Sequence, residues 1–282
     1  MIKVTSPIHY NYATIKITQS RLDKGLIAIP MSLARWFPEQ NARIQIFLDD
    51  AITPEIKQYS SYKSRTRECR IGGMAEWFRN NRIKDGDEIV IQSIDKERFI
   101  YRLIPESRFI LKTNEIQNNL DRSESEISAK EEIGKLSRWA GIVQGKVVLN
   151  EYIRLINTIP IKERRYVSKY SKQTKESTPY NLRFLLGDIY QGHCQVCDFW
   201  FLKKDNEPYF EIHHINPLIS NNPKNLLVVC ANCHNQFEYA NVENGFNQDN
   251  WLVKVRFNNK IYQVNQIILT AKREEFIKQL HI

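Results

Sequence analysis

Four of the five cysteines in this 282-residue chain form two closely spaced pairs, Cys194 with Cys197 and Cys230 with Cys233. Two residues separate the cysteines of each pair, and 32 residues separate the pairs. Thiolates at this spacing suit one tetrahedral Zn²⁺ ion, whereas a disulfide framework is not expected in a reducing compartment. The four cysteines therefore predict a structural zinc site. Cys69 stands alone and is expected to be a small core residue.

Three histidines and an asparagine lie beside the cysteine pairs and are not needed for the zinc ion. His213 and His214 are adjacent, Asn225 follows them, and His234 comes directly after the second cysteine pair. Neighbouring side chains of a strand point to opposite sides, so one imidazole can bind a divalent metal while the other faces an attacking water. A histidine pKa of about 6.5 suits a general base near neutral pH. A plain zinc knuckle, the usual interpretation of a bare cysteine quartet, leaves these residues unexplained.

The segment from Cys194 to Phe237 resembles the HNH endonuclease family, in the zinc-bearing branch of the ββα-metal nucleases. The resemblance implies that His214 is the general base and that Asn225 holds the loop that orients it. It also implies that His213 and His234 bind a catalytic divalent metal, Mg²⁺ or Mn²⁺, at the scissile phosphate. The likeness is carried by Cys194, Cys197, Glu211, His213, His214, Pro217, Asn225, Leu226, Cys230, Cys233 and His234.

Two glutamates close to these histidines are further candidates. Glu211, two residues before His213, occupies a position that is often acidic in the family, and it is expected to support a metal ligand from behind. Glu238 lies one helical turn after His234 and is a candidate third ligand. His193 is expected to be an ordinary surface residue.

The chain carries 41 lysines and arginines against 32 aspartates and glutamates, which gives a net charge of +9. An excess of this size favours a polyanionic partner, although many basic proteins bind no nucleic acid. No apolar run approaches the roughly 18–20 residues that a membrane span needs. The first residues lack the apolar core of a signal peptide, so we expect a cytoplasmic protein without membrane contact.

Residues 1–106 are expected to be mainly β-structure. Short, β-branched segments separated by turns favour a small barrel. Two short helices are predicted within it, Met31–Phe37 between two prolines and Met74–Arg79 after two glycines. The predicted strands are Thr14–Ile17, Leu26–Ile29, Arg43–Leu48, Glu88–Gln92 and Arg98–Ile104.

This part of the chain resembles the DNA-binding pseudobarrel of plant transcription factors, such as the auxin-response factors, and of some type II restriction enzymes. The likeness lies in Leu26–Pro30, Trp36-Phe37 and, above all, Arg70–Asp87. It implies that two loops, Thr18–Lys24 and Gln58–Arg67, grip the major groove. Without the resemblance, both segments would be interpreted as solvated loops. Arginine and glutamine can bind base edges there, and lysine can reach phosphates. The candidate DNA contacts are Gln19, Arg21, Lys24, Lys63, Arg65 and Arg67.

Residues 107–178 are expected to form a helical and basic connector. A capping box at Ser128–Glu131 predicts a helix that ends by Gly141, and Asn150 is expected to cap a second helix that stops before Pro160. The basic stretch Lys162–Thr178 is expected to be either a solvated linker or a strap over DNA phosphates.

Residues 179–282 are expected to hold the zinc and histidine motifs in a second domain. Three further elements are predicted around them. They are a helix at Tyr180–Gln191, a hairpin at Trp251–Val264 and a last helix from Thr270 to Leu280.

The predicted fold class is α+β with two domains, an N-terminal β-pseudobarrel with short helices and a C-terminal zinc-stapled ββα-metal HNH domain, joined by the helical connector. The two resemblances imply a site-specific double-stranded DNA endonuclease of type II restriction character. Cutting both strands with one active site per chain implies a homodimer, and a restriction enzyme implies a methyltransferase that acts on the same site.

Two alternatives stay open. One is a modification-dependent or non-specific HNH defence nuclease, which differs in what it selects on DNA. The other is a DNA-binding regulator with a degenerate nuclease fold, against which the intact His213, His214 and His234 argue.

Overall fold

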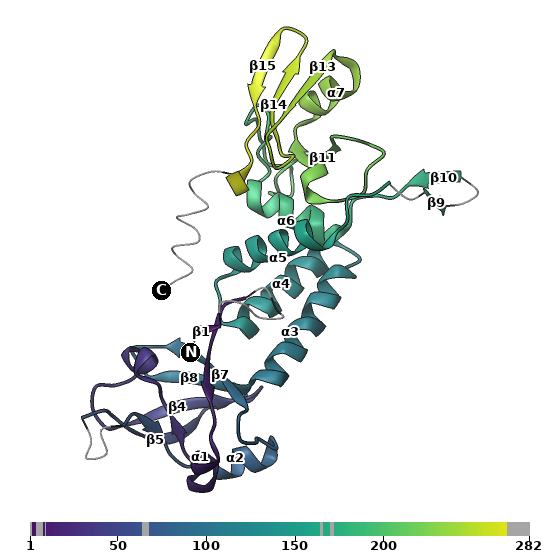
Figure 1. The fold of residues 1–282 in the computed structure, drawn as a ribbon. Coiled ribbons are helices and arrows are strands. Elements are labelled where there is room, and N and C mark those ends of the chain that lie inside the picture. The colour runs from purple at the N-terminus through teal and green to yellow at the C-terminus, as the bar shows by residue number, and fades with distance from the viewer. Residues whose placement is uncertain are drawn as a thin grey trace. The chain divides into compact units, whose positions relative to one another are not determined.

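The computed structural model describes residues 2–3, 8, 10–63, 68–163, 166–169 and 172–269, with the backbone alone for 2–3, 166–169 and 172–175. The chain divides into two compact units (Figure 1). Unit 1 comprises residues 1–117 and 138–141, and unit 2 comprises residues 118–137 and 142–282. The domain boundaries expected after residues 106 and 178 stay predictions.

Unit 1 is built on an eight-stranded sheet that curls into a nearly closed barrel (Figure 1). Its strand order in space is β1-β2-β7-β8-β4-β5-β6-β3. Neighbouring strands are antiparallel, except that β4 and β8 run parallel. The strands are β1 (Ile2–Lys3), β2 (Tyr12–Lys16), β3 (Ile27–Ala28), β4 (Ala42–Leu48), β5 (Glu55–Ser60), β6 (Arg70–Ile71), β7 (Glu88–Asp95) and β8 (Ile100–Pro105).

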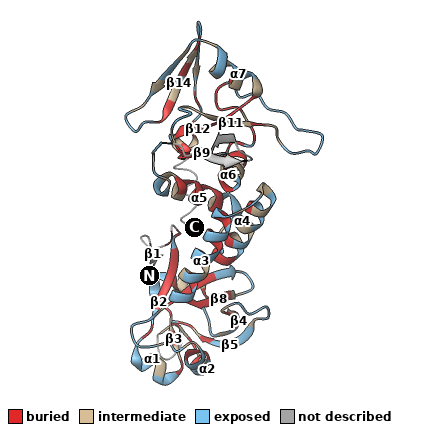
Figure 2. Cartoon of the chain, turned by 90° about the vertical axis from the view of Figure 1, so that its right-hand side faces the viewer, coloured by how far each residue is buried: buried red, intermediate tan, exposed pale blue. Residues whose placement is uncertain are grey.

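The core of unit 1 lies inside this barrel, and the predicted strands all contribute to it. Strands β2 and β8 are buried over most of their length (Figure 2), and β7 is buried at Ile89–Gln92. In β4, Ile44 and Ile46 are buried while Arg43 and Gln45 are exposed. This period of two fits a strand with one face on a core and one face open. Cys69 is 3% exposed and belongs to the core, as expected.

Short helices connect the strands of unit 1. The 3₁₀ helix η1 (Met31–Trp36) and helix α2 (Ala75–Asn80) confirm the two predicted helices. The prediction of a loop at Thr18–Lys24 was wrong, because most of this segment is helix α1 (Gln19–Lys24). Gly25 ends α1 with a φ of 60°, and a Cβ at this position would lie 2.9 Å from that of Ala75. A glycine is therefore required where α1 meets α2.

The second predicted loop is shorter than expected. Gln58–Ser60 belongs to β5, where Gln58 lies opposite Arg43 of β4. The connection to β6 therefore starts at Ser61. Its residues 64–67, which include the candidates Arg65 and Arg67, lie outside the described residues.

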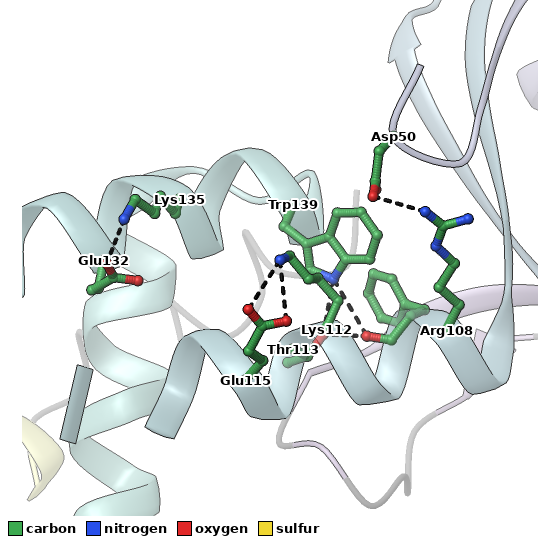
Figure 3. Close-up of polar contacts among 9 residues, drawn as sticks. Asp50, Arg108, Lys112, Thr113, Glu115, Glu132, Lys135 and Trp139 are labelled. Carbon is green, nitrogen blue, oxygen red and sulfur yellow. Dashed lines mark hydrogen bonds and ion pairs between the residues drawn. The ribbon is translucent and has the colours of Figure 1, made fainter. Parts of the chain in front are cut away.

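Helix α3 (Glu106–Asp121) follows the last strand and was not among the predicted helices. Its buried stripe contains Phe109, Thr113, Ile116, Gln117 and Leu120, so two of these five positions are polar and the helical period is obscured. One of the buried polar side chains has a hydrogen-bond partner from helix α4 (Glu126–Ala140), as Figure 3 shows. The indole nitrogen of Trp139 donates to Thr113 Oγ1 at 3.2 Å. Tertiary hydrogen bonds replace apolar contacts along part of this helix.

Unit 2 contains three long helices or parts of them, α4 (Glu126–Ala140), α5 (Gln144–Thr158) and α6 (Tyr180–Tyr190). Helix α6 confirms the helix predicted there. Helix α4 starts earlier than the capping box predicted, because Ser125 Oγ accepts from the backbone N–H of Ser128 at 3.1 Å. Asn150 was wrongly predicted to cap α5. It lies inside the helix, whose buried face already begins at Val147.

Part of the basic stretch after α5 forms two short strands. Strands β9 (Tyr166–Lys169) and β10 (Lys172–Lys175) form an antiparallel pair, with Lys169 opposite Lys172. This pairing tests neither a solvated linker nor a basic strap over phosphates, so both stay predictions.

The rest of unit 2 holds the predicted site. It consists of a two-stranded sheet, a helix and a three-stranded sheet. The last helix, predicted at 270–280, lies outside the described residues. The predicted hairpin at Trp251–Val264 is confirmed by β14 and β15. The elements are β11 (Glu211–His214), η2 (Pro223–Asn225), β12 (Leu226–Val229), α7 (Ala231–Tyr239), β13 (Val242–Phe246), β14 (Leu252–Phe257), β15 (Lys260–Gln263) and η3 (Ile267–Leu269).

The α+β fold class is confirmed, with a β-barrel in unit 1 and a ββα arrangement that carries the cysteines in unit 2. Among the residues that the structure describes, none of the helices combines the length and the apolar character that a membrane crossing requires.

Candidate active site

The first cysteine pair lies in a tight turn and the second pair starts a helix. The backbone N–H of Asp198 donates to the carbonyl of Cys194 at 2.8 Å, and Asp198 closes the turn with a φ of 62°. Cys230 caps helix α7, where its sulfur accepts from the backbone N–H of Cys233 at 3.4 Å. Both turns direct their sulfur atoms to one place, and the four ligand atoms lie within 4.8 Å of one another.

The geometry of this cysteine cluster fits zinc. Zn–S bonds of about 2.3 Å in a tetrahedron place the sulfurs ~3.8 Å apart, and the sulfurs of Cys197 and Cys230 are 3.7 Å apart. A hydrogen bond to Cys194 and burial raise the pKa of the Cys233 thiol well above its ordinary value. A divalent cation lets all four sulfurs be thiolates at once, so the cluster can hold a zinc ion.

Gln195 fastens the first cysteine turn to the sheet, a role that the sequence patterns did not indicate. Its backbone N–H donates to the carbonyl of Val228 at 2.9 Å, and its side-chain oxygen accepts from the N–H of Val228 at 2.7 Å. Gln195 is 3% exposed. The cysteine turn therefore extends the β11–β12 sheet, in which His213 lies opposite Leu227.

The sheet and helix α7 bring His213 and His234 together. Their ring centroids lie 5.4 Å apart, edge to face. The ring of His213 also stacks on Phe237, with centroids 4.1 Å apart and ring planes 15° apart. Burial, together with the charges of His234 and His214, lowers the pKa of His213 to about 4. His213 is therefore a neutral imidazole near pH 7, the form in which histidine binds metals.

The carboxylate of Glu211 contacts the imidazole of His234 and fixes its orientation. One carboxylate oxygen of Glu211 contacts Nδ1 of His234, and the other accepts the hydroxyl of Tyr209. The bond from Tyr209 and then that from His234 lower the pKa of Glu211, so it is a carboxylate. A carboxylate on one ring nitrogen of a histidine leaves the other nitrogen to a metal. Glu211 is thus brought to the site as expected, while the supporting Tyr209 was missed.

Glu238 does not join this arrangement. It is exposed on α7. Within the described part of the chain, the four cysteines are the one group of three or more metal-ligand side chains whose donor atoms come together. His193 lies outside the site, where it stacks on Trp200 and contacts Asp198.

His214, at the end of β11, contacts a second asparagine that was not predicted. Its Nε2 lies 2.9 Å from Oδ1 of Asn221, and Nδ2 of Asn221 donates to the carbonyl of Ser177 at 3.0 Å. Asn221 is 4% exposed, in the loop between β11 and β12. An asparagine in a loop suggests a turn, so no sequence signal marked this contact.

The side chain of Asn225 closes the same loop by bonding the backbone of the loop. Its Oδ1 accepts from the N–H of Asn216 at 2.8 Å, and its Nδ2 donates to the carbonyls of Asn216, Ile219 and Ser220 at 3.0, 3.2 and 3.2 Å. The side chain is 7% exposed. One amide thus bonds four backbone groups between β11 and β12, which agrees with the loop-holding role that the resemblance implied.

Three of the six candidate DNA contacts of unit 1, Gln19, Arg21 and Lys63, contact acidic neighbours. Gln19 donates to Asp23 at 2.7 Å, and Arg21 forms an ion pair with Glu68. Lys63 pairs with Glu39 at 2.9 Å. Lys24 lies in the last turn of α1. Because Glu68 borders the second loop, the Arg21 pair brings α1 next to that loop.

Gln58, from the second predicted loop, lies beside two further exposed polar side chains on β4. Arg43 of β4 lies opposite Gln58 of β5, and Gln45 lies opposite Ile56. Arg43, Gln45 and Gln58 are exposed on the face of the sheet that is turned away from the core. The alternation of polar and apolar residues in β4 predicts a strand but assigns no role to its exposed face.

Comparisons with known proteins agree with the arrangement in unit 2. Residues 194–238 match the family model of the HNH endonucleases, which confirms the predicted HNH motif. None of the curated proteins matches the chain. A solved complex of Arabidopsis FUS3 with DNA is similar at 12% identity and a TM-score of 0.28, covering 33% of this chain and 94% of that chain. A complex of the Arabidopsis thaliana transcription factor LEC2 with DNA is similar at 15% identity and a TM-score of 0.28, covering 33% and 90%.

Proposed function

We propose that this chain, which carries an HNH endonuclease match at residues 194–238, is a site-specific double-stranded DNA endonuclease of type II restriction character. The observation that carries the proposal is the meeting of His213 and His234 across β11 and α7, with His214 next to them on the same strand. Two histidine ligands and an adjacent base are the parts that metal-assisted phosphodiester hydrolysis needs.

In this proposal the histidines divide the work. His214 accepts the proton of the water that attacks the phosphorus, and the bond from phosphorus to the leaving oxygen breaks on the opposite side. His213 and His234 would hold a divalent metal, which would supply stabilisation of the charge that develops during hydrolysis. Glu211 keeps His234 in the orientation that ligation needs, and Asn225 keeps the loop after His214 in place.

Activity is expected to require a divalent ion distinct from the zinc ion. Chelation mild enough to leave the zinc content unchanged should stop cleavage, and Mg²⁺ or Mn²⁺ should restore it, because two imidazoles leave coordination positions open for oxygen ligands. Zinc stoichiometry is measured by elemental analysis beside each cleavage assay. Full cleavage after chelation, with zinc still bound, would contradict a separate catalytic metal.

Unit 1 is proposed to select the DNA sequence through α1 and the connection after β5. In the His214→Ala background, which binds without cutting, the full chain should enrich one motif from a random duplex pool. Arg21→Ala should then relax the preference at one position, since a bidentate base contact discriminates by about 1–3 kcal/mol. Lys63→Ala, the matched control, should weaken binding to all sequences about equally and reduce its salt dependence. A pool without any enriched sequence would leave a non-specific nuclease.

The activity itself is tested on plasmids of mixed sequence. Discrete fragments indicate a specific site, a smear indicates cutting without preference, and intact plasmid contradicts the nuclease. The same digestion of methylated and unmodified plasmid separates a restriction enzyme, protected by a partner methyltransferase, from a modification-dependent enzyme. Cutting both strands with one site per chain further implies a homodimer on DNA, which sedimentation of the complex measures.

A further inference from the structure

The loop between β11 and β12 buries three consecutive polar side chains, Ser220, Asn221 and Asn222, which are 5%, 4% and 2% exposed. Buried polar groups need hydrogen-bond partners, because an unsatisfied one destabilises the fold. Each side chain bonds a carbonyl of a segment distant in the sequence. Ser220 Oγ donates to Pro160 at 2.6 Å, Asn221 Nδ2 to Ser177 at 3.0 Å and Asn222 Nδ2 to Ile159 at 2.5 Å.

Asn221 also contacts the imidazole of His214, and its amide can point only one way. The carbonyl of Ser177 is an acceptor, so it must face the amide nitrogen of Asn221. The amide oxygen therefore faces Nε2 of His214, at 2.9 Å, and Nε2 must be the donor. In the neutral imidazole the lone pair then belongs to Nδ1.

We propose that Asn221 is a positioning residue for DNA cleavage, which holds His214 in one orientation and in the tautomer protonated at Nε2. The proposal rests on the proposed function, in which His214 is the general base. A base must present its unprotonated nitrogen to the water, and a misplacement of about 1 Å can cost about 10²-fold in rate. Asn225 fixes the backbone of the loop, whereas Asn221 fixes the side chain that takes the proton.

The test compares Asn221→Ala with Ser220→Ala. Both variants remove a buried hydrogen bond from the same loop, but Ser220 donates to Pro160 and not to the histidine. Asn221→Ala is expected to lower kcat by about 10²-fold. Its KM, zinc content and melting temperature should resemble those of Ser220→Ala. Equal kcat values for the two alanine variants would overturn the positioning role.

A second measurement does not depend on cleavage. In the full chain labelled with ¹⁵N-histidine, the ring-nitrogen shifts of His214 should show a proton on Nε2, and Asn221→Ala should change them. A wild-type His214 protonated at Nδ1 overturns the proposal whatever the activity. If the shifts are as expected but His214→Ala still cleaves DNA, the contact stands and the general-base role fails, so the two failures are distinguishable.

Discussion

Replacing His214 with alanine is expected to lower the rate of DNA cleavage by about 10²–10⁴-fold, the range for the loss of a general base. DNA binding and zinc content should stay at wild-type levels, because His214 lies at the end of β11 and outside the cysteine cluster. Single-turnover cleavage with enzyme in excess measures the chemical step, and a gel-shift assay with the same duplex measures binding.

The matched control for His214→Ala is His193→Ala. His193 stacks on Trp200 and contacts Asp198, outside the proposed site, so its loss should leave cleavage unchanged. Equal rates for the two variants would remove His214 from the mechanism. A loss of DNA binding in His214→Ala would assign it to the interface with DNA instead.

Replacing Cys197 with serine is expected to abolish zinc binding and to unfold the nuclease part of unit 2. Structural zinc sites contribute about 10–16 kcal/mol in zinc-finger peptides, comparable with the whole stability of a domain. Three of the cysteines also belong to a buried cluster with Leu227, Val229 and Leu252, so the loss should spread into both sheets. Elemental analysis and a thermal melt followed by circular dichroism measure the two effects.

Cys69→Ala is the control for the zinc prediction. Cys69 is equally a cysteine, but it lies in the core of unit 1 and outside the cluster. It should keep one zinc ion per chain and lose only the stability that a small buried side chain contributes. A Cys197→Ser protein that is zinc-free, folded and active would show that the cluster holds no structural metal.

The parts of the site that the sequence predicted are those defined by short spacing. Two residues between the cysteines of a pair allow a tight turn, and adjacent histidines on a strand must point to opposite sides. The order of Cys194, His213, Asn225 and His234 carried the resemblance to the HNH family, and that resemblance implied the sheet and the helix between them. The ββα arrangement contains these elements, with β11 paired to β12 and α7 following.

The contacts that were missed join side chains through space rather than through a pattern. The hydroxyl of Tyr209 donates to the carboxylate of Glu211, and Asn221 links His214 to the carbonyl of Ser177. Polar residues that a fold buries look the same in a sequence as solvated ones. For the same reason Thr113, which is fully buried, hid the helical period of α3.

Both ends of the basic hairpin are fastened to the loop that carries Asn221. The N–H of Ser220 donates to the carbonyl of Lys162 at 2.7 Å, and Glu163 forms an isolated bridge with Ile219. At the far end, Asn221 bonds the carbonyl of Ser177. The segment between these two attachments, residues 164–176, therefore has both ends fixed to one loop. Doubling its length would cost only about 0.6 kcal/mol in loop-closure entropy. Exchanging residues 164–176 for another insert should therefore leave the proposed catalytic residues in place.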